Sequence, residues 1–244
     1  MQQGGKTVYG AAVGILMLET QFPRIPGDIG NALSWDFPVH YRVVRGATPD
    51  LAVRQDPGQL ADLFIEAGRD LLAMGCDGIT TSCGFLALIQ DQVKQALGVP
   101  VATSSLMQIP MVQALLPAGK RVGVLTISEQ SLTPAHLRAA GAPEDTPIGS
   151  PEGLRCFTHD ILRDAAQIDF AACELDMIDA AQALIGRNPD LGALVLECTN
   201  MVPHAAVLRR VTGLPVFTIH SFITWFQAGL MPRQFERGLM DHRT

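Results

Sequence analysis

The sequence predicts an α/β fold made of two similar halves, and three observations support this prediction. Short apolar runs alternate with longer stretches of helical periodicity, a pattern typical of parallel sheets covered by helices on both faces. One module of strand, turn, helix and strand occurs twice along the chain. The 244 residues, 48% hydrophobic and 17% charged, are enough to bury a substantial core.

The strands are expected at the apolar runs, which are too short for membrane spans. They are residues 13–18, 39–44, 78–82, 99–103, 121–127, 193–198 and 214–219. Two longer stretches carry apolar residues at three-and-four spacing, which indicates amphipathic helices. These stretches are 59–74 and 160–185, the second with a break near 168–170.

The repeated module indicates an internal duplication. Cys83 and Cys198 each follow an apolar run, and fifteen residues after each comes a Gly-x-Pro-Val turn, at Gly98 and Gly213. The two earlier strands VGIL and VGVL are offset by 109 residues, close to the 115 residues between the cysteines. We therefore expect two pseudo-symmetric halves, residues 1–105 plus 219–244 and residues 106–218, with the active site in the cleft between them.

Composition excludes several classes of function. The net charge of −6 provides no basic surface for nucleic acid or an anionic membrane. The five cysteines form no CxxC or zinc-finger pattern, so no metal site is expected. The apolar run at 8–18 follows Lys6 but lacks a signal-peptide cleavage pattern, and no Gly-rich nucleotide motif is present. The sequence predicts a cytoplasmic protein with reduced thiols.

The positions of Cys83 and Cys198 suggest a specific chemistry. Both follow the carboxyl end of an expected parallel strand, where ligands of open sheets bind. Each precedes a helix start, which favours anions and lowers a thiol pKa. If the halves face each other, one thiolate removes a proton from a carbon centre while the opposite thiol delivers one, which inverts that centre.

Short polar residues surround these cysteines and are expected to hold a small carboxylate substrate. They lie at the ends of the first strands of each half and beside both cysteines, while Phe85 adds an apolar surface. The expected substrate-binding residues are Glu19, Thr20, Ser82, Gly84, Phe85, Thr126, Thr199 and Asn200.

These motifs resemble a known family. VGIL near the start, TTSCGF at 80–85, VGVLTI at 122–127 and LECTNM at 196–201 are similar to the aspartate/glutamate racemase superfamily, over residues 13–226. The superfamily includes amino-acid and hydantoin racemases, maleate isomerase and arylmalonate decarboxylase. The resemblance implies an enzyme without a cofactor, Cys83 and Cys198 as its catalytic pair, and a homodimer.

Two departures bear on the substrate. Amino-acid racemases commonly have Asn-Thr after the first cysteine, where this chain has Gly84 and Phe85. They commonly have Gly before the second cysteine and often His two residues after it, where this chain has Glu197 and Asn200. Strand alternation predicts that Glu197 points away from Cys198. Free aspartate or glutamate is therefore not assured as substrate.

The first hypothesis is a racemase or epimerase acting on an amino acid or related carboxylate through the two cysteines. One alternative is a maleate-type cis–trans isomerase, in which a cysteine adds covalently to an alkene. Another is a non-enzymatic protein that binds small carboxylates. The roles of Glu197, His204 and His220 stay open from sequence.

Overall fold

A computed structural model describes residues 4–235 and contains two parallel four-stranded sheets. The strand order is β2-β1-β3-β4 in the first sheet and β6-β5-β7-β8 in the second, so the two halves share one topology. Every strand pairing within them is parallel. The expected α/β fold with two pseudo-symmetric halves is confirmed.

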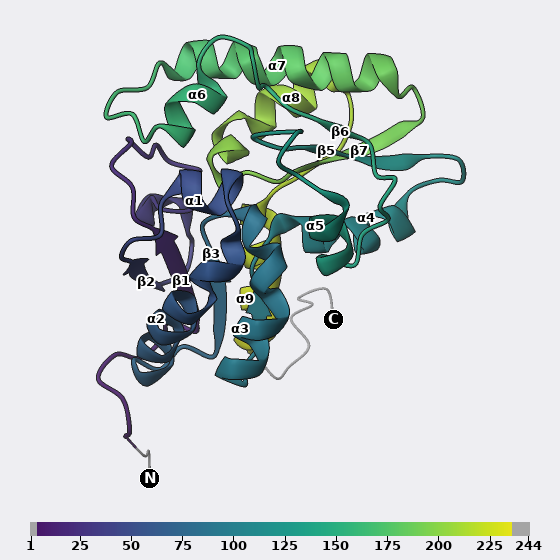
Figure 1. Ribbon diagram of the computed structural model, residues 1–244. Coiled ribbons are helices and arrows are strands. Elements are labelled where there is room, and N and C mark those ends of the chain that lie inside the picture. The colour runs from purple at the N-terminus through teal and green to yellow at the C-terminus, as the bar shows by residue number, and fades with distance from the viewer. Residues whose placement is uncertain (1–3, 236–244) are drawn as a thin grey trace, which may run out of the picture.

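The first half contains the N-terminal elements, and helices cover both faces of its sheet (Figure 1). Helix α2 packs on β1 and β2, and α9 contacts β3. The elements are β1 Val13–Leu18, η1 Ala32–Ser34, β2 Val39–Val44, α1 Pro49–Arg54, η2 Pro57–Leu60, α2 Ala61–Ala73, β3 Gly78–Thr81, η3 Gly84–Ile89, α3 Gln90–Leu97, β4 Val101–Ala102 and, at the C-terminal end, α9 Ile219–Leu230.

In the second half, the long helix α7 lies over one face of the sheet and α4 lies on the other (Figure 1). Strand β6 was not predicted, because two residues form no recognisable apolar run. The elements are η4 Ser105–Gln108, α4 Ile109–Leu115, β5 Arg121–Leu125, α5 Pro134–Ala139, β6 Ile148–Gly149, α6 Phe157–Leu162, α7 Phe170–Arg187, β7 Leu191–Leu196, η5 Thr199–His204, α8 Ala205–Thr212 and β8 Val216–Phe217.

The duplicated module has the same local structure in both halves. Cys83 precedes η3 and α3, and Cys198 precedes η5 and α8. Helices α3 and α8 end at Gly98 and Gly213, whose φ angles of 66° and 72° lie in the left-handed region that glycine adopts without strain. The sequence spacing therefore reflects one structural unit used twice.

Helix α9 packs on the first sheet, although it follows the second half in the chain. Ile219, Phe222 and Ile223 share a buried cluster with Val13 and Ile15 of β1. The boundaries 1–105 plus 219–244 and 106–218 stay a prediction, and residues 1–3 and 236–244 within them lie outside the described part. Within residues 4–235, no helix combines the length and apolar character needed to cross a membrane.

Candidate active site

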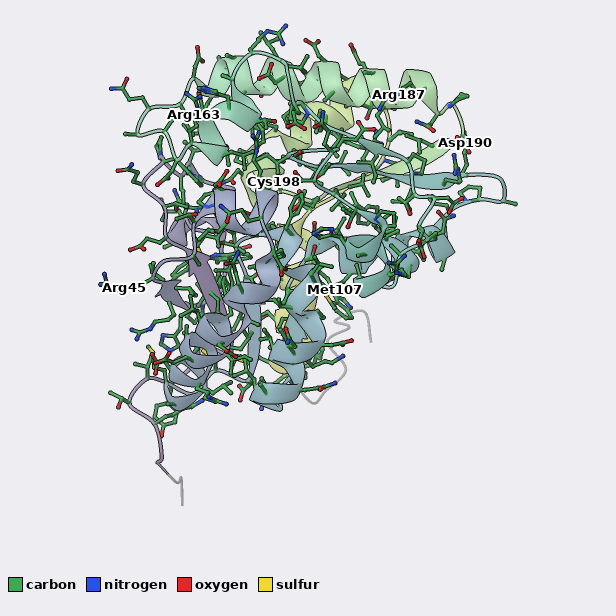
Figure 2. The ribbon with its side chains drawn as sticks, in the orientation of Figure 1. Arg45, Met107, Arg163, Arg187, Asp190 and Cys198 are labelled. Atoms are coloured by element: carbon green, nitrogen blue, oxygen red, sulfur yellow. The ribbon has the colours of Figure 1, made fainter. Side chains whose placement is uncertain are left out.

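A narrow pocket lies between the two halves, at the carboxyl ends of β1, β3, β5 and β7. Figure 2 shows Cys198 where the halves meet. Parallel strands direct their carboxyl ends to one edge, so residues distant in sequence converge there. The lining residues are Leu18, Thr20, Phe22, Arg24, Pro49, Val53, Ser82, Cys83, Gly84, Ile127, Ile161, Leu162, Glu197, Cys198 and Asn200.

The structure brings the two predicted cysteines to this pocket, one from each half. Cys83 and Cys198 are 8% and 7% exposed. The backbone N–H groups of Phe85 and Leu86 lower the pKa of the Cys83 thiol, and that of Asn200 lowers the pKa of the Cys198 thiol. The two thiols are close enough that charge on Cys83 raises the pKa of Cys198. They can therefore act on one bound molecule.

The helix starts lower both thiol pKa values, as expected, but the net shift of each pKa is upward. Burial raises the pKa of Cys83 and of Cys198 well above the usual thiol value, and the nearby Glu197 carboxylate raises both further. The backbone N–H groups lower these pKa values, but their effect is the smaller one. Desolvation of a thiolate outweighs the amide hydrogen bonds here.

Glu197 occupies a central position that strand alternation did not predict. It is 1% exposed, lines the pocket, and its Oε2 accepts hydrogen bonds from Thr126 Oγ1 at 2.8 Å and Ile127 N at 3.4 Å. The backbone N–H of Gly84 faces this carboxylate and lowers its pKa. Burial raises the pKa of Glu197 to about 7, despite these three donors.

Four of the predicted substrate-binding residues line the pocket: Thr20, Ser82, Gly84 and Asn200. The Ser82 hydroxyl oxygen accepts a hydrogen bond from Leu18 N at 2.9 Å. Its own hydroxyl proton is left available for a ligand.

The other four predicted residues do not line the pocket. Glu19 is exposed and accepts a hydrogen bond from Gly46 N at 2.8 Å. Thr126 donates to Glu197, and Thr199 donates to the Ser82 carbonyl at 2.9 Å, which ties the two halves together. Phe85 is buried, with its ring edge-on to His136. These side chains support the pocket rather than face it.

Sequence reasoning missed Arg24 and Asp28, which join the pocket through a polar network. Arg24 donates to Asp28 Oδ1 at 2.7 Å and to Thr20 Oγ1 at 2.9 Å, and its guanidinium lies over the Phe22 ring. Asn200 donates to Asp28 Oδ2 at 2.6 Å. Arg24 is the only basic side chain among the described residues that line the pocket. It follows the first strand in a loop without periodicity, so no sequence signal marked it.

Neither of the two histidines left open by sequence lines the pocket. His204 is buried beside Phe157, with Nδ1 at 3.9 Å from Glu174. His220 stacks on Trp35 and its Nε2 lies 2.7 Å from the Ser34 carbonyl. Both have structural partners elsewhere in the fold.

Several solved enzyme structures have the same fold as this chain. Unliganded arylmalonate decarboxylase matches 93% of this chain and 96% of its own, with a TM-score of 0.58 and 15% identity. Glutamate racemase of Francisella tularensis covers 93% and 85% (TM-score 0.56, 14% identity). Allantoin racemase of Pseudomonas fluorescens covers 89% and 90% (TM-score 0.53, 16% identity). The chain has the two-domain α/β fold of these racemases and of this decarboxylase, as expected from its motifs.

The relatives found by sequence comparison are named for a different activity from that of the structural neighbours. A dimethylsulfoniopropionate lyase of Durusdinium sp. clade D is 25% identical over 85% of this chain and 71% of its own. Dimethylsulfoniopropionate lyase 7 of Emiliania huxleyi is 28% identical over 90% of this chain and 67% of its own. Dimethylsulfoniopropionate lyase 5 of the same organism is 31% identical over 84% of this chain, which spans 42% of that relative.

No protein-family model matches the chain. The sequence relatives and the structural neighbours carry enzyme names, which supports an enzyme. The lyase names belong to another reaction class than the isomerase expected from sequence, so amino-acid racemase activity is not confirmed.

Proposed function

We propose that this protein is a lyase without a cofactor that removes the α-proton of a small carboxylate and expels a thioether from the β-carbon. Dimethylsulfoniopropionate is the candidate substrate. The observation that carries the proposal is the lyase name of relatives aligned over 84–90% of the chain, combined with a pocket that holds two cysteines.

The reaction needs one base and no redox partner. A thiolate takes the proton from the carbon next to the carboxylate. The electron pair left on that carbon forms the double bond, and the bond between the β-carbon and sulfur breaks. Dimethyl sulfide leaves as a neutral molecule, acrylate remains, and the proton passes from the thiol to solvent.

Cys83 is the base in this proposal. Two backbone N–H groups lower the pKa of its thiol, whereas one lowers that of Cys198. Each hydrogen bond favours the thiolate, so Cys83 is better supported in that form. Cys198 donates its thiol proton to Asn200 Oδ1 at 3.5 Å in the structure. In the proposal it remains a thiol and turns this proton to the negative charge that develops on the substrate.

The remaining contacts suit a zwitterion with a carboxylate at one end and a sulfonium at the other. Arg24 binds the carboxylate, since a guanidinium matches carboxylate geometry. The apolar wall receives the two S-methyl groups. Because the sulfonium charge disappears during elimination, an apolar wall favours the products over the charged substrate. That wall comprises Leu18, Phe22, Pro49, Val53, Ile127, Ile161 and Leu162.

The racemase of the first hypothesis is the second candidate, favoured by one observation. Two cysteines on equivalent turns of the two halves line one pocket, which suits proton removal on one face and delivery on the other. Elimination needs only the first of these steps.

The test incubates the purified protein with dimethylsulfoniopropionate and follows dimethyl sulfide by gas chromatography and acrylate by proton NMR. A parallel panel of amino acids, hydantoins and hydroxy acids is followed by chiral chromatography. We expect equal amounts of the two elimination products and no loss of chirality.

Three outcomes would contradict the proposal. Racemisation without dimethyl sulfide supports the racemase. A covalent succinyl-type adduct, seen by mass spectrometry after incubation with maleate, supports the cis–trans isomerase. Thermal stabilisation by carboxylates without turnover supports a binding protein.

A further inference from the structure

Two cysteines outside the proposed active site lie in contact with each other. Cys156, which precedes α6, has its Sγ 3.5 Å from Sγ of Cys173 on α7. Neither cysteine has an equivalent in the first half of the chain, and neither thiol takes part in the proposed reaction. We propose that Cys156 and Cys173 form a redox-active dithiol, which peroxides convert reversibly into a disulfide between α6 and α7. This inference goes beyond the proposed function and does not depend on it.

The two thiols differ in access to solvent, which assigns their roles. Cys156 is half-buried, whereas Cys173 is 1% exposed. A peroxide therefore reaches Cys156 first, and Cys173 is the resolving thiol that lies in contact with it. Redox-sensing proteins often place an accessible cysteine next to a resolving cysteine. Burial raises the pKa of both thiols here, so the proposal rests on their contact and their difference in access.

The oxidation balances with a peroxide as the oxidant. The Cys156 thiolate attacks one oxygen of hydrogen peroxide, which forms a sulfenic acid and, after protonation of the leaving hydroxide, water. The Cys173 thiolate then attacks the sulfenic sulfur and releases the second water. Two thiols are oxidised to one disulfide, and one peroxide is reduced to two waters.

The backbone around Cys156 is already held against α7. The carboxylate of Asp176 on α7 accepts hydrogen bonds from the N–H groups of Arg155, Cys156 and Phe157, at 2.9, 2.8 and 2.9 Å. Closing the sulfur–sulfur distance from 3.5 Å to the disulfide value of about 2 Å thus requires only a small shift of α6.

That shift would reach the proposed active site. Ile161 and Leu162 of α6 line the pocket that contains the two cysteines of the proposed active site. A second, small hollow is lined by Cys173, Ile161 and Asn200, among others. The disulfide would therefore fasten one wall of the pocket to α7.

The test treats the full, reduced protein with hydrogen peroxide, blocks the remaining thiols by alkylation, and maps tryptic peptides by mass spectrometry. Cleavage by trypsin after arginine and lysine gives peptide 156–163 with Cys156, peptide 164–187 with Cys173 and peptide 188–209 with Cys198. We expect one linked pair, 156–163 with 164–187, which dithiothreitol separates. The number of free thiols should fall from five to three.

Two variants make the test decisive. Cys156→Ser should form no linked peptide and keep the basal activity, whereas Cys173→Ser should accumulate a sulfenic acid at Cys156 that dimedone labels. Oxidised wild-type protein should melt at a higher temperature than reduced protein, and Cys156→Ser should show no such increase. A linkage between the peptides of Cys83 and Cys198 alone, or irreversible over-oxidation of Cys156 with Cys173 still free, would overturn the proposal.

Discussion

The carboxylate of Glu197, the residue before Cys198, is buried directly against Gly84, the residue after Cys83. A Cβ atom at position 84 would collide with Oε1 and the backbone carbonyl of Glu197, so only glycine leaves room for this carboxyl. Gly84 and Glu197 are two of the four positions that depart from the racemase pattern, and in the structure these two lie against each other. This contact places a titratable carboxyl between the two cysteine turns.

Replacing either cysteine with alanine should reduce kcat/KM about 10³-fold, because each variant loses a proton donor or acceptor at the reacting carbon. For elimination, Cys83→Ala should be the more damaging, since Cys83 is the base. Steady-state rates of acrylate release measure the effect. Cys156→Ser is the matched control and should retain wild-type rates. Equal and complete loss in both alanine variants, together with racemisation by wild type, would instead support two-base catalysis.

Glu197 should make the fold less stable as pH rises from about 5 to 8. Its pKa is about 7 in the folded protein against 4.5 in the unfolded chain, so between these values the folded state retains a proton that the unfolded state has lost. The free energy of unfolding should fall by about 3 kcal/mol across this range. Urea unfolding at pH 5 and pH 8 should show this fall in wild type and a smaller one in Glu197→Gln. An equal fall in both proteins would contradict the assignment.

The same substitution should alter the pH dependence of activity. The Glu197 carboxylate raises the pKa of both thiols, so its removal should lower them and favour the thiolate at a given pH. We expect the rise of kcat/KM with pH to occur at lower pH in Glu197→Gln than in wild type. Rate profiles between pH 6 and 10 measure it. A profile that keeps its midpoint would show that Glu197 does not act on the catalytic thiol.

Arg24→Met should raise KM for a carboxylate substrate at least tenfold, because it removes the basic side chain that lines the pocket. The substitution also leaves the buried Asp28 without its ion-pair partner, so Arg24→Met/Asp28→Asn separates the two effects. Arg45→Met changes the net charge equally on the exposed side of the first half and should leave KM unchanged (Figure 2). An unchanged KM in both Arg24 variants would show that the carboxylate binds elsewhere.

Asp164 should hold the two halves together over the pocket. Its Oδ1 accepts hydrogen bonds from Gln21 N at 2.7 Å and Phe22 N at 3.1 Å, and its φ of 54° lies in the left-handed region. Asp164→Ala loses both bonds and strains the backbone, so the free energy of unfolding should fall by about 2 kcal/mol. Asparagine tolerates this conformation and can still accept, so Asp164→Asn should lose less than half as much in urea titrations. Equal losses in both variants would argue against this role.

Much of the fold could be predicted from sequence because it depends on local patterns. Strands β1 and β2 were predicted with the bounds that the structure shows. Strand β1 is buried and apolar along its whole length, whereas β2 is a partly exposed edge strand. The break between α6 and α7 and the Gly98 and Gly213 turns also follow from nearby residues. Strand β6 was missed because two residues carry no periodicity.

By itself, the sequence determined that two equivalent strand ends each carry a cysteine. These strands belong to two separate sheets, and the packing of the two halves brings both cysteines to one pocket. Tertiary structure decided the rest of the candidate site. The contact of Asp28 with Asn200 joins residues 172 positions apart, and Thr126 turns to Glu197 instead of the pocket. The thiol pKa values rise because burial outweighs the local helix starts. The spacing of residues along the chain indicates which of them lie on the same strand, turn or helix. The burial and the charge around a side chain depend on the residues that the other half packs against it.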